Sequence, residues 1–150
     1  MFTCKLSNTH EDFCLLTHAL DEELNVRYGK EQALYDKHNL IDPIETALVG
    51  YEGEIPVACG CFKKIDETTV EIKRMFVMPA YRRRGFSSQI LSALEAWAGE
   101  CGFSHAQLET GKAQPEAIAL YTKIGYEVIP NYTPYVGMEN SVCMHKVLRS

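Results

Sequence analysis

Three consecutive arginines stand directly before Gly85 in the segment "RMFVMPAYRRRGFSSQ". A strand-like apolar run ends just before them and a helical pattern begins after Gly85, so the arginines lie at a predicted helix start. The first amides of a helix have no partner within it, and the helix dipole adds partial positive charge there. Gly85 lets an anion approach the backbone, and the two serines that follow shortly after it add small hydroxyl donors. The segment therefore predicts a phosphate site, and it suits a diphosphate because arginine binds phosphate in a bidentate manner.

The basic segment does not belong to either of the two common nucleotide-binding motifs. The chain contains no G-x-x-x-x-G-K-[ST], which excludes the nucleotide P-loop, and no G-x-G-x-x-G, so a dinucleotide-binding fold has no support. A run of like charges is most often a solvated loop, and for the triplet taken alone that alternative stays open.

The rest of the chain predicts the elements that must position this site. A short strand and a helix from Glu11 to Tyr28 open the chain, and a helix after Gly85, a strand, a helix and two strands close it. Between them lie three strand-like runs typical of an antiparallel meander, "ETALVGYE", "IPVACGCFKKI" and "TTVEIKRMFVM". The order β, α, β, β, β, α, β, α, β, β predicts an α/β (α+β) fold, a mixed sheet with helices on its faces. The polar segment from Lys30 to Asp42 fits either a short helix or a loop over a substrate.

Length and composition limit the classes of function. A chain of 150 residues fits one domain, residues 1–150, and 46% hydrophobic with 23% charged residues is typical of a globular protein. A net charge of -5 argues against nucleic-acid and anionic-membrane partners. The N-terminus lacks the pattern of a signal peptide and no run is long enough to span a bilayer, so we expect a cytoplasmic protein. The six cysteines have no zinc-like spacing, and we expect most of them to be buried thiols and no metal to be bound.

The segment "RMFVMPAYRRRGFSSQIL" resembles the acetyl-coenzyme A signature of the GCN5-related N-acetyltransferase (GNAT) superfamily. That signature reads Arg or Gln, two residues, Gly, one residue, then Gly or Ala, and here Arg82, Gly85 and Ser87 occupy those positions. Ser87 is small but departs from the usual Gly or Ala. "LETGKAQPEAIALYTKIGYEVI" is similar to the strand, helix and "GY" element of the same family, and the resemblance extends from about Glu45 to Leu148.

The resemblance implies an acetyl-CoA-dependent acyltransferase with a GNAT-type, mostly antiparallel sheet and splayed central strands. It implies that the coenzyme diphosphate contacts Arg82 and the backbone amides of the residues that follow it, which are Arg83, Arg84, Gly85, Phe86, Ser87 and Ser88. It also implies that pantetheine lies along Met75, Phe76 and Val77. Gln114 matches a coenzyme-contacting position that is usually Asn, and Tyr121 matches the tyrosine that protonates the leaving thiolate.

Acetyl transfer to an amine also requires a proton acceptor, because alkyl amines are mostly protonated at neutral pH. Glu71 and Glu109 are the candidates, since they lie on adjacent predicted strands; a water chain, or a surface role for either carboxylate, remains an alternative. Strand alternation predicts that Glu71 shares one face with Lys73, Met75 and Val77. Lys73 either binds a substrate carboxylate or neutralises Glu71.

The C-terminal tail contains the candidate residues for the acceptor site. The tail "NYTPYVGMENSVCM" places Tyr132 and Tyr135 where the family lines its acceptor pocket, and with the segment from Lys30 to Asp42 they would form an aromatic wall. This favours a small amine or amino acid as the acceptor. Two alternatives stay open, namely a protein N-terminus, as in the ribosomal-protein alanine acetyltransferases, and a sensor that binds acyl-CoA without turnover. A homodimer is expected only from the resemblance.

Overall fold

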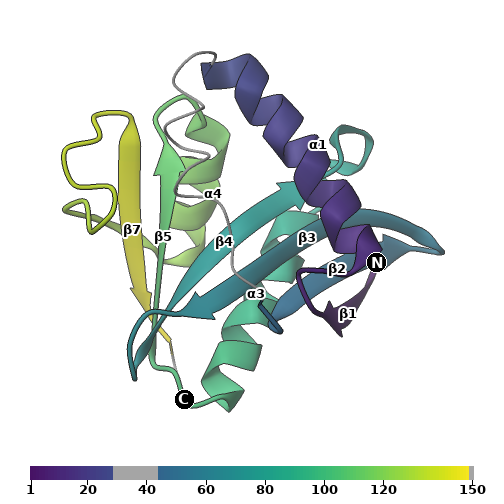
Figure 1. The fold of residues 1–150 in the computed structure, drawn as a ribbon, viewed down its shortest axis with the longest axis horizontal. Helices are drawn as coiled ribbons and strands as arrows, with labels where there is room; N and C mark the ends of the chain where they lie inside the picture. The colour runs from purple at the N-terminus through teal and green to yellow at the C-terminus, as the bar shows by residue number, and fades with distance from the viewer. Residues whose placement is uncertain (29–43, 149–150) are drawn as a thin grey trace.

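A computed structural model describes residues 1–28 and 44–148, and they form a seven-stranded mixed sheet with helices on both faces (Figure 1). The strands in chain order are β1 (Phe2–Leu6), β2 (Ala47–Glu52), β3 (Ile55–Lys64), β4 (Thr69–Val77), β5 (His105–Gly111), β6 (Glu127–Ile129) and β7 (Ser141–Val147). The helices are α1 (Glu11–Tyr28), the short 3₁₀ helix η2 (Pro79–Tyr81), α3 (Phe86–Glu100) and α4 (Pro115–Ile124). The sheet order is β1-β2-β3-β4-β5-β7-β6, in which β4 and β5 pair in parallel and the other described pairs are antiparallel. The predicted fold class and element order are confirmed, and the segment from Lys30 to Asp42 lies outside the described residues.

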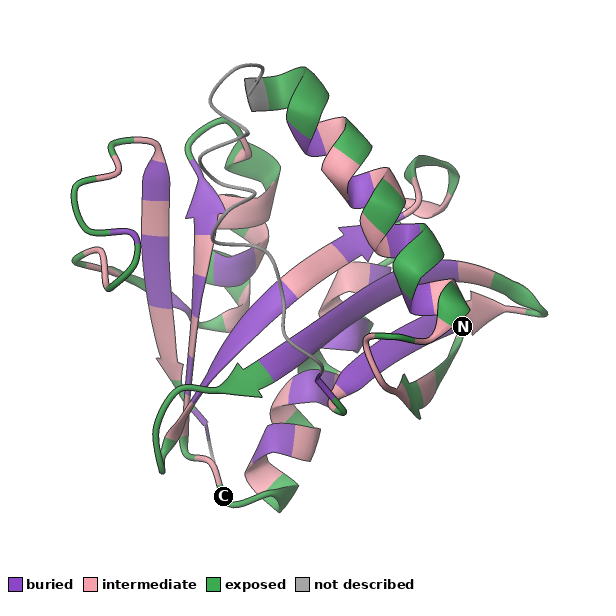
Figure 2. Ribbon diagram, viewed as in Figure 1, coloured by how far each residue is buried: buried purple, intermediate pink, exposed green. Residues whose placement is uncertain are grey.

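Two apolar clusters hold the helices against opposite faces of the sheet. On one face, α1 packs through Phe13, Leu16 and Leu20 against the buried side chains of β2 and β3. On the other face, α3 and α4 pack over the longer cluster that includes Leu94 and Leu108. Figure 2 shows the result, with buried residues along the central strands and mostly exposed residues on the outer side of α1. The central strands are therefore covered on both faces.

The central strands β4 and β5 separate soon after they begin. Their backbone pairing covers only three positions, from Thr69↔His105 to Glu71↔Gln107, and beyond these the two strands diverge (Figure 1). The edge of β4 from Ile72 to Val77 therefore has no strand partner on this side within the described residues. The splayed strands expected from the resemblance are confirmed, and they leave backbone donors and acceptors available to a ligand.

A bulge in β4 corrects one expectation about side-chain direction. Arg74 has a positive φ of 59°, and the pairing between β3 and β4 shifts there, so that β4 has one residue more than its partner. Such a bulge reverses the alternation of the residues that follow it. Glu71 and Lys73 therefore face α1, whereas Met75 and Val77 pack into the cluster under α3. The prediction that all four share one face was therefore right for Glu71 and Lys73 and wrong for Met75 and Val77.

None of the helices in the described part of the chain is long and apolar enough to cross a membrane. The C-x-C pair of β3, Cys59 and Cys61, is buried beneath α1, and burial raises the pKa of the Cys61 thiol to about 12. Both thiols therefore act as small apolar groups in the core.

Candidate functional site

The loop between β4 and α3 leads into the predicted phosphate site at the start of α3. Pro79 ends β4 and begins η2, and Gly85 then precedes the first turn of α3 with a φ of 79°. This left-handed conformation is one that glycine adopts without strain, and a Cβ atom on Gly85 would meet no heavy atom within 4 Å. Gly85 supplies no side-chain cap and the first turn of α3 carries no acidic residue. The local geometry favours a negatively charged group at this point.

A long cleft of about 570 Å³ extends from this helix start into the gap between β4 and α4. Its volume lies within the range of ordinary ligand sites. Ten of the eleven residues predicted to bind the coenzyme line it: Met75, Phe76, Val77, Arg82, Arg83, Gly85, Phe86, Ser87, Ser88 and Gln114. The remaining one, Arg84, has its guanidinium carbon 5.3 Å from the centre of the Tyr81 ring and does not line the cleft.

An inner chamber of about 120 Å³ adjoins the long cleft on the side of β5. Glu71, Glu109, Lys73 and Tyr135 line the chamber, and Leu20 and Leu24 of α1 cover it. Tyr121 lines both spaces, as do Met75 and Gln114. The structure thus brings the predicted acid, the two predicted bases and two of the three predicted acceptor-binding residues to the junction of the two spaces.

Glu109 is the carboxylate whose chemistry this chamber changes most. Burial raises the pKa of Glu109 to about 7, although a hydrogen bond from Ser141 and the charge of Lys73 act in the opposite direction. The Ser141 hydroxyl donates to Oε2 of Glu109 across 2.8 Å. A carboxyl group with a pKa near neutrality is well matched to accept a proton from an amine and release it again.

Glu71 has a different environment, although it lines the same chamber. Its side chain is 4% exposed, and its Oε1 lies 3.4 Å from Nζ of Lys73 and 3.9 Å from Nζ of Lys63. The Tyr132 hydroxyl donates to Oε2 of Glu71 across 2.7 Å. The rings of Tyr132 and Tyr135 meet edge to face with centroids 5.6 Å apart. Glu71 therefore connects β4 to the segment between β6 and β7 and fixes one wall of the chamber.

Tyr121 stays protonated throughout the neutral range. It lies on the buried face of α4, and burial together with the charge of Glu109 raises its pKa above the ordinary tyrosine value. Gly125 ends α4 with a φ of 113°. The glycine of the motif "GY" therefore sets the end of this helix. Tyr121 can donate a hydrogen bond at the junction of the two spaces.

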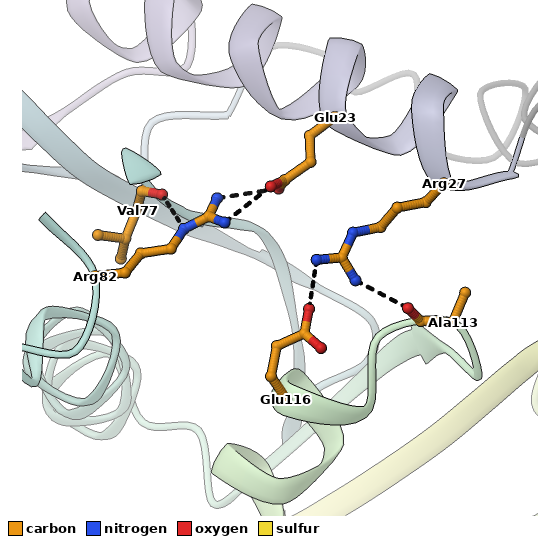
Figure 3. Close-up of polar contacts among 6 residues, drawn as sticks. All are labelled: Glu23, Arg27, Val77, Arg82, Ala113 and Glu116. Atoms are coloured by element: carbon orange, nitrogen blue, oxygen red, sulfur yellow. Dashed lines mark hydrogen bonds and ion pairs between the residues drawn. The ribbon is translucent and has the colours of Figure 1, made fainter. Parts of the chain in front are cut away.

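Helix α1 lies along the long cleft and forms hydrogen bonds and ion pairs with residues on both of its sides (Figure 3). Arg82 donates from Nε to the Val77 carbonyl across 2.8 Å, and its two terminal nitrogens donate to the Glu23 carboxylate across 2.9 and 3.1 Å. Arg27 donates to the Ala113 carbonyl across 2.9 Å and forms an ion pair with Glu116. The first pair links α1 to the loop between β4 and α3, and the second links it to the start of α4.

Sequence reasoning missed several residues of this site. Ser141 was not singled out, although its place at the start of the last strand opposite Gly111 brings it beside Glu109. Glu23, Arg27 and Arg74 were not recognised either; Arg74 donates from the bulge to Asp21 of α1 across 2.8 Å. Their partners are far away in sequence, so helical periodicity gives no signal for them.

Comparisons with known proteins show the family to which this fold belongs. The family model "Acetyltransferase (GNAT) family" matches residues 13–126. An IAA acetyltransferase of Azospirillum brasilense is 34% identical over 135 residues, which cover 89% of this chain and 88% of the relative. A structure from Klebsiella pneumoniae assigned as an acyl-CoA N-acyltransferase has a TM-score of 0.82 at 31% identity, covering 99% of this chain and 97% of that one. An aminoglycoside 6'-N-acetyltransferase complexed with coenzyme A shares the fold, with a TM-score of 0.71 at 15% identity over 100% and 98% of the two chains.

The fold is that of an acyl-CoA N-acyltransferase. The chain belongs to the GNAT family and is an acetyl-CoA-dependent N-acetyltransferase.

Proposed function

We propose that this protein transfers an acetyl group from acetyl-CoA to the primary amine of a small molecule, such as an amino acid or a related amine. The observation that carries the proposal is the inner chamber, which meets the long cleft at Tyr121 and contains Glu109. At about 120 Å³ the chamber is comparable to a cavity that holds benzene, so it suits a small acceptor better than a folded protein surface.

The coenzyme fits the residues that line the long cleft. The amides from Arg83 to Ser88 would hold the diphosphate, and the unpaired edge of β4 from Met75 to Val77 would pair with the amides of the pantetheine arm. Gln114 lies where α4 begins and contributes a side-chain amide to the same wall. The bound coenzyme supplies the acetyl thioester, and the protein supplies position and proton transfer.

The chain's own residues supply two proton-transfer groups and an acceptor site. Glu109 accepts the proton that the acceptor ammonium must lose, and Tyr121 donates a proton to the sulfur as the thioester bond breaks. Lys73, beside Glu71, lies where it would bind a carboxylate of an amino-acid acceptor, and Tyr135 closes the far wall. Holding two reactants at one junction in a fixed orientation gives the main acceleration, since effective molarities reach about 10⁵ M.

The function is tested by thiol release from acetyl-CoA with a panel of amino acids, polyamines, amine drugs and a peptide N-terminus. Release with one or more small amines, at a rate above hydrolysis, supports the proposal. Release with the peptide alone assigns the protein to the class that modifies protein N-termini. Tight binding of coenzyme A with no release from any acceptor would instead identify a sensor.

The ion pair between Arg82 and Glu23 predicts an effect on coenzyme binding. Because Glu23 occupies both terminal nitrogens of Arg82, the bound diphosphate must compete with it. We expect Glu23→Gln to lower the Kd of coenzyme A about fivefold, the size of one partly exposed ion pair. Calorimetric titration measures this change.

Glu22→Gln is the matched control, since Glu22 is exposed and pairs with His18 within α1. It should leave the Kd unchanged. An unchanged or weaker affinity in Glu23→Gln would mean that Arg82 and Glu23 act together to shape the loop and do not compete with the diphosphate.

A further inference from the structure

Ser141, the first residue of β7, lies directly beside the proposed base of the reaction. In the register of β5 and β7, Glu109 is opposite Cys143 and Gly111 is opposite Ser141, so Ser141 is the diagonal neighbour of Glu109. Diagonal neighbours on one face of a sheet are within reach of longer side chains. The backbone amide of Ser141 donates to the Met138 carbonyl, which fixes the residue at the point where the preceding segment enters the strand.

The contact between the two side chains is specific. Ser141 is 5% exposed, and its hydroxyl lies 2.8 Å from Oε2 of Glu109. A hydroxyl that donates to a carboxylate stabilises the ionised form more than the neutral form. This bond therefore acts on both the direction and the charge of Glu109.

The charged and titratable groups around Glu109 come from four elements. Glu71 and Lys73 face it from β4, Tyr121 from α4, Cys143 from β7, and Tyr135 from the segment between β6 and β7. Lys73 lies 3.4 Å from the Glu71 carboxylate, so its positive charge acts on both Glu71 and Glu109. Helix α1 presents leucines to the same space. Ser141 is accordingly the neutral donor that favours the charged form of Glu109 in otherwise desolvating surroundings.

We propose that Ser141 is a positioning residue for acetyl transfer, an inference that rests on the proposed function. Its hydroxyl holds Oε2 of Glu109, so that Oε1 receives the proton of the acceptor. In that step an N–H bond of the ammonium breaks, an O–H bond forms at Oε1, and the nitrogen keeps the electron pair with which it attacks the acetyl carbon.

The pH dependence of the reaction reports on this bond. Ser141→Ala removes a hydrogen bond to a charged group, and we expect the pKa of Glu109 to rise by about one unit, from about 7 to about 8. Because the base must be ionised, kcat/KM should fall about tenfold near pH 6 and change little near pH 9. Ser141→Thr, which keeps the hydroxyl, should restore the profile of the unmodified protein.

A second measurement does not depend on turnover. The carboxyl signal of Glu109 in a ¹³C-glutamate-labelled sample, assigned by its loss in Glu109→Gln, gives the pKa directly. A rise of about one unit in Ser141→Ala supports the proposal even if no acceptor has been found. In the Glu109→Gln background, Ser141→Ala should leave the pH profile unchanged, since the amide at position 109 does not titrate in this range.

Two results would overturn the role of Ser141. One is a Ser141→Ala protein with a lower Tm but an unmoved Glu109 titration, because that is the signature of a merely structural hydroxyl. The other is a shifted Glu109 titration in Ser141→Ala that is also seen in a folded Ser141→Thr protein. Failure of every amine in the thiol-release assay would refute the proposed function, whereas the titration would still decide what Ser141 does.

Discussion

Replacing Tyr121 by phenylalanine should lower kcat about 100-fold, with a small change in the KM for acetyl-CoA. The ring would remain packed on the buried face of α4, so the fold and both cavities are retained. What is lost is the hydroxyl at the junction of the long cleft and the inner chamber, where the sulfur must take up a proton. Steady-state kinetics between about pH 6 and pH 10 measure the effect, which should be smallest at high pH, where a thiolate leaves without a proton donor.

Tyr126→Phe is the matched control for this experiment. The Tyr126 ring lies 5.9 Å from that of Tyr121, but its hydroxyl donates to Glu95 of α3 and lines neither cavity. Removal of that hydroxyl should cost stability and leave kcat nearly unchanged. Equal rates for Tyr121→Phe and the unmodified protein at every pH would remove Tyr121 from the reaction.

Glu109 and Tyr121 are expected to act in sequence because the charge of one sets the acidity of the other. A tyrosine whose pKa lies above its ordinary value is a poor acid toward a thiolate. The charge on Glu109 contributes to that raised value, and protonation of Glu109 removes this contribution. When Glu109 accepts the proton of the acceptor, Tyr121 therefore becomes a better donor at the stage when the sulfur needs one.

Local signals in the sequence were sufficient to predict the fold class and the order of the elements, whereas the splayed central strands were expected from the resemblance. Pro79, Gly85 and Gly125 mark the ends of elements at the positions where the structure has them. The apolar period of α3 and the alternation of β7 depend on neighbours within a few residues, and such patterns survive in the folded protein. The antiparallel meander of β2, β3 and β4 was predicted in this way, whereas the parallel pairing of β4 with β5 was not.

The orientation of side chains in the site could be predicted only in part. The prediction of side-chain direction assumes strict alternation along a strand. It fails at the β4 bulge because nothing in the sequence indicates that Arg74 adopts a positive φ. The cover that α1 forms over the cleft depends on pairs such as Arg82 with Glu23, which are 59 residues apart. Contacts of this kind are set by the packing of the whole fold, which local periodicity does not report.

Glu109→Gln should lower kcat/KM at least 100-fold at neutral pH and abolish the acidic limb of the pH profile. The unmodified protein should lose activity below a midpoint of about pH 7, because protonation of Glu109 removes the base. The amide cannot take up the proton and has no titration in this range. Glu67→Gln is the control, since the Glu67 side chain is 90% exposed and pairs with Lys64 away from both cavities. A Glu109→Gln protein with the original profile would show that a water chain or another group is the base.

Glu109→Gln should also raise the stability of the protein, but only above the pH at which an unperturbed glutamate ionises. In the folded protein the pKa of Glu109 is about 7, above the value of 4.5 for an unperturbed glutamate. Between these values the unfolded chain ionises first, so stability is lost as the pH rises through this window and stays lower above it. Glutamine has no such loss, and the Tm of Glu109→Gln should exceed that of the unmodified protein near pH 8 and approach it below about pH 4.5. Replacing a carboxylate that has a structural role would lower the stability of the protein. Replacing one that serves catalysis lowers the activity and raises the stability. Calorimetry at the two pH values therefore distinguishes the two roles, and a lower Tm at both would assign Glu109 to the architecture of the chamber.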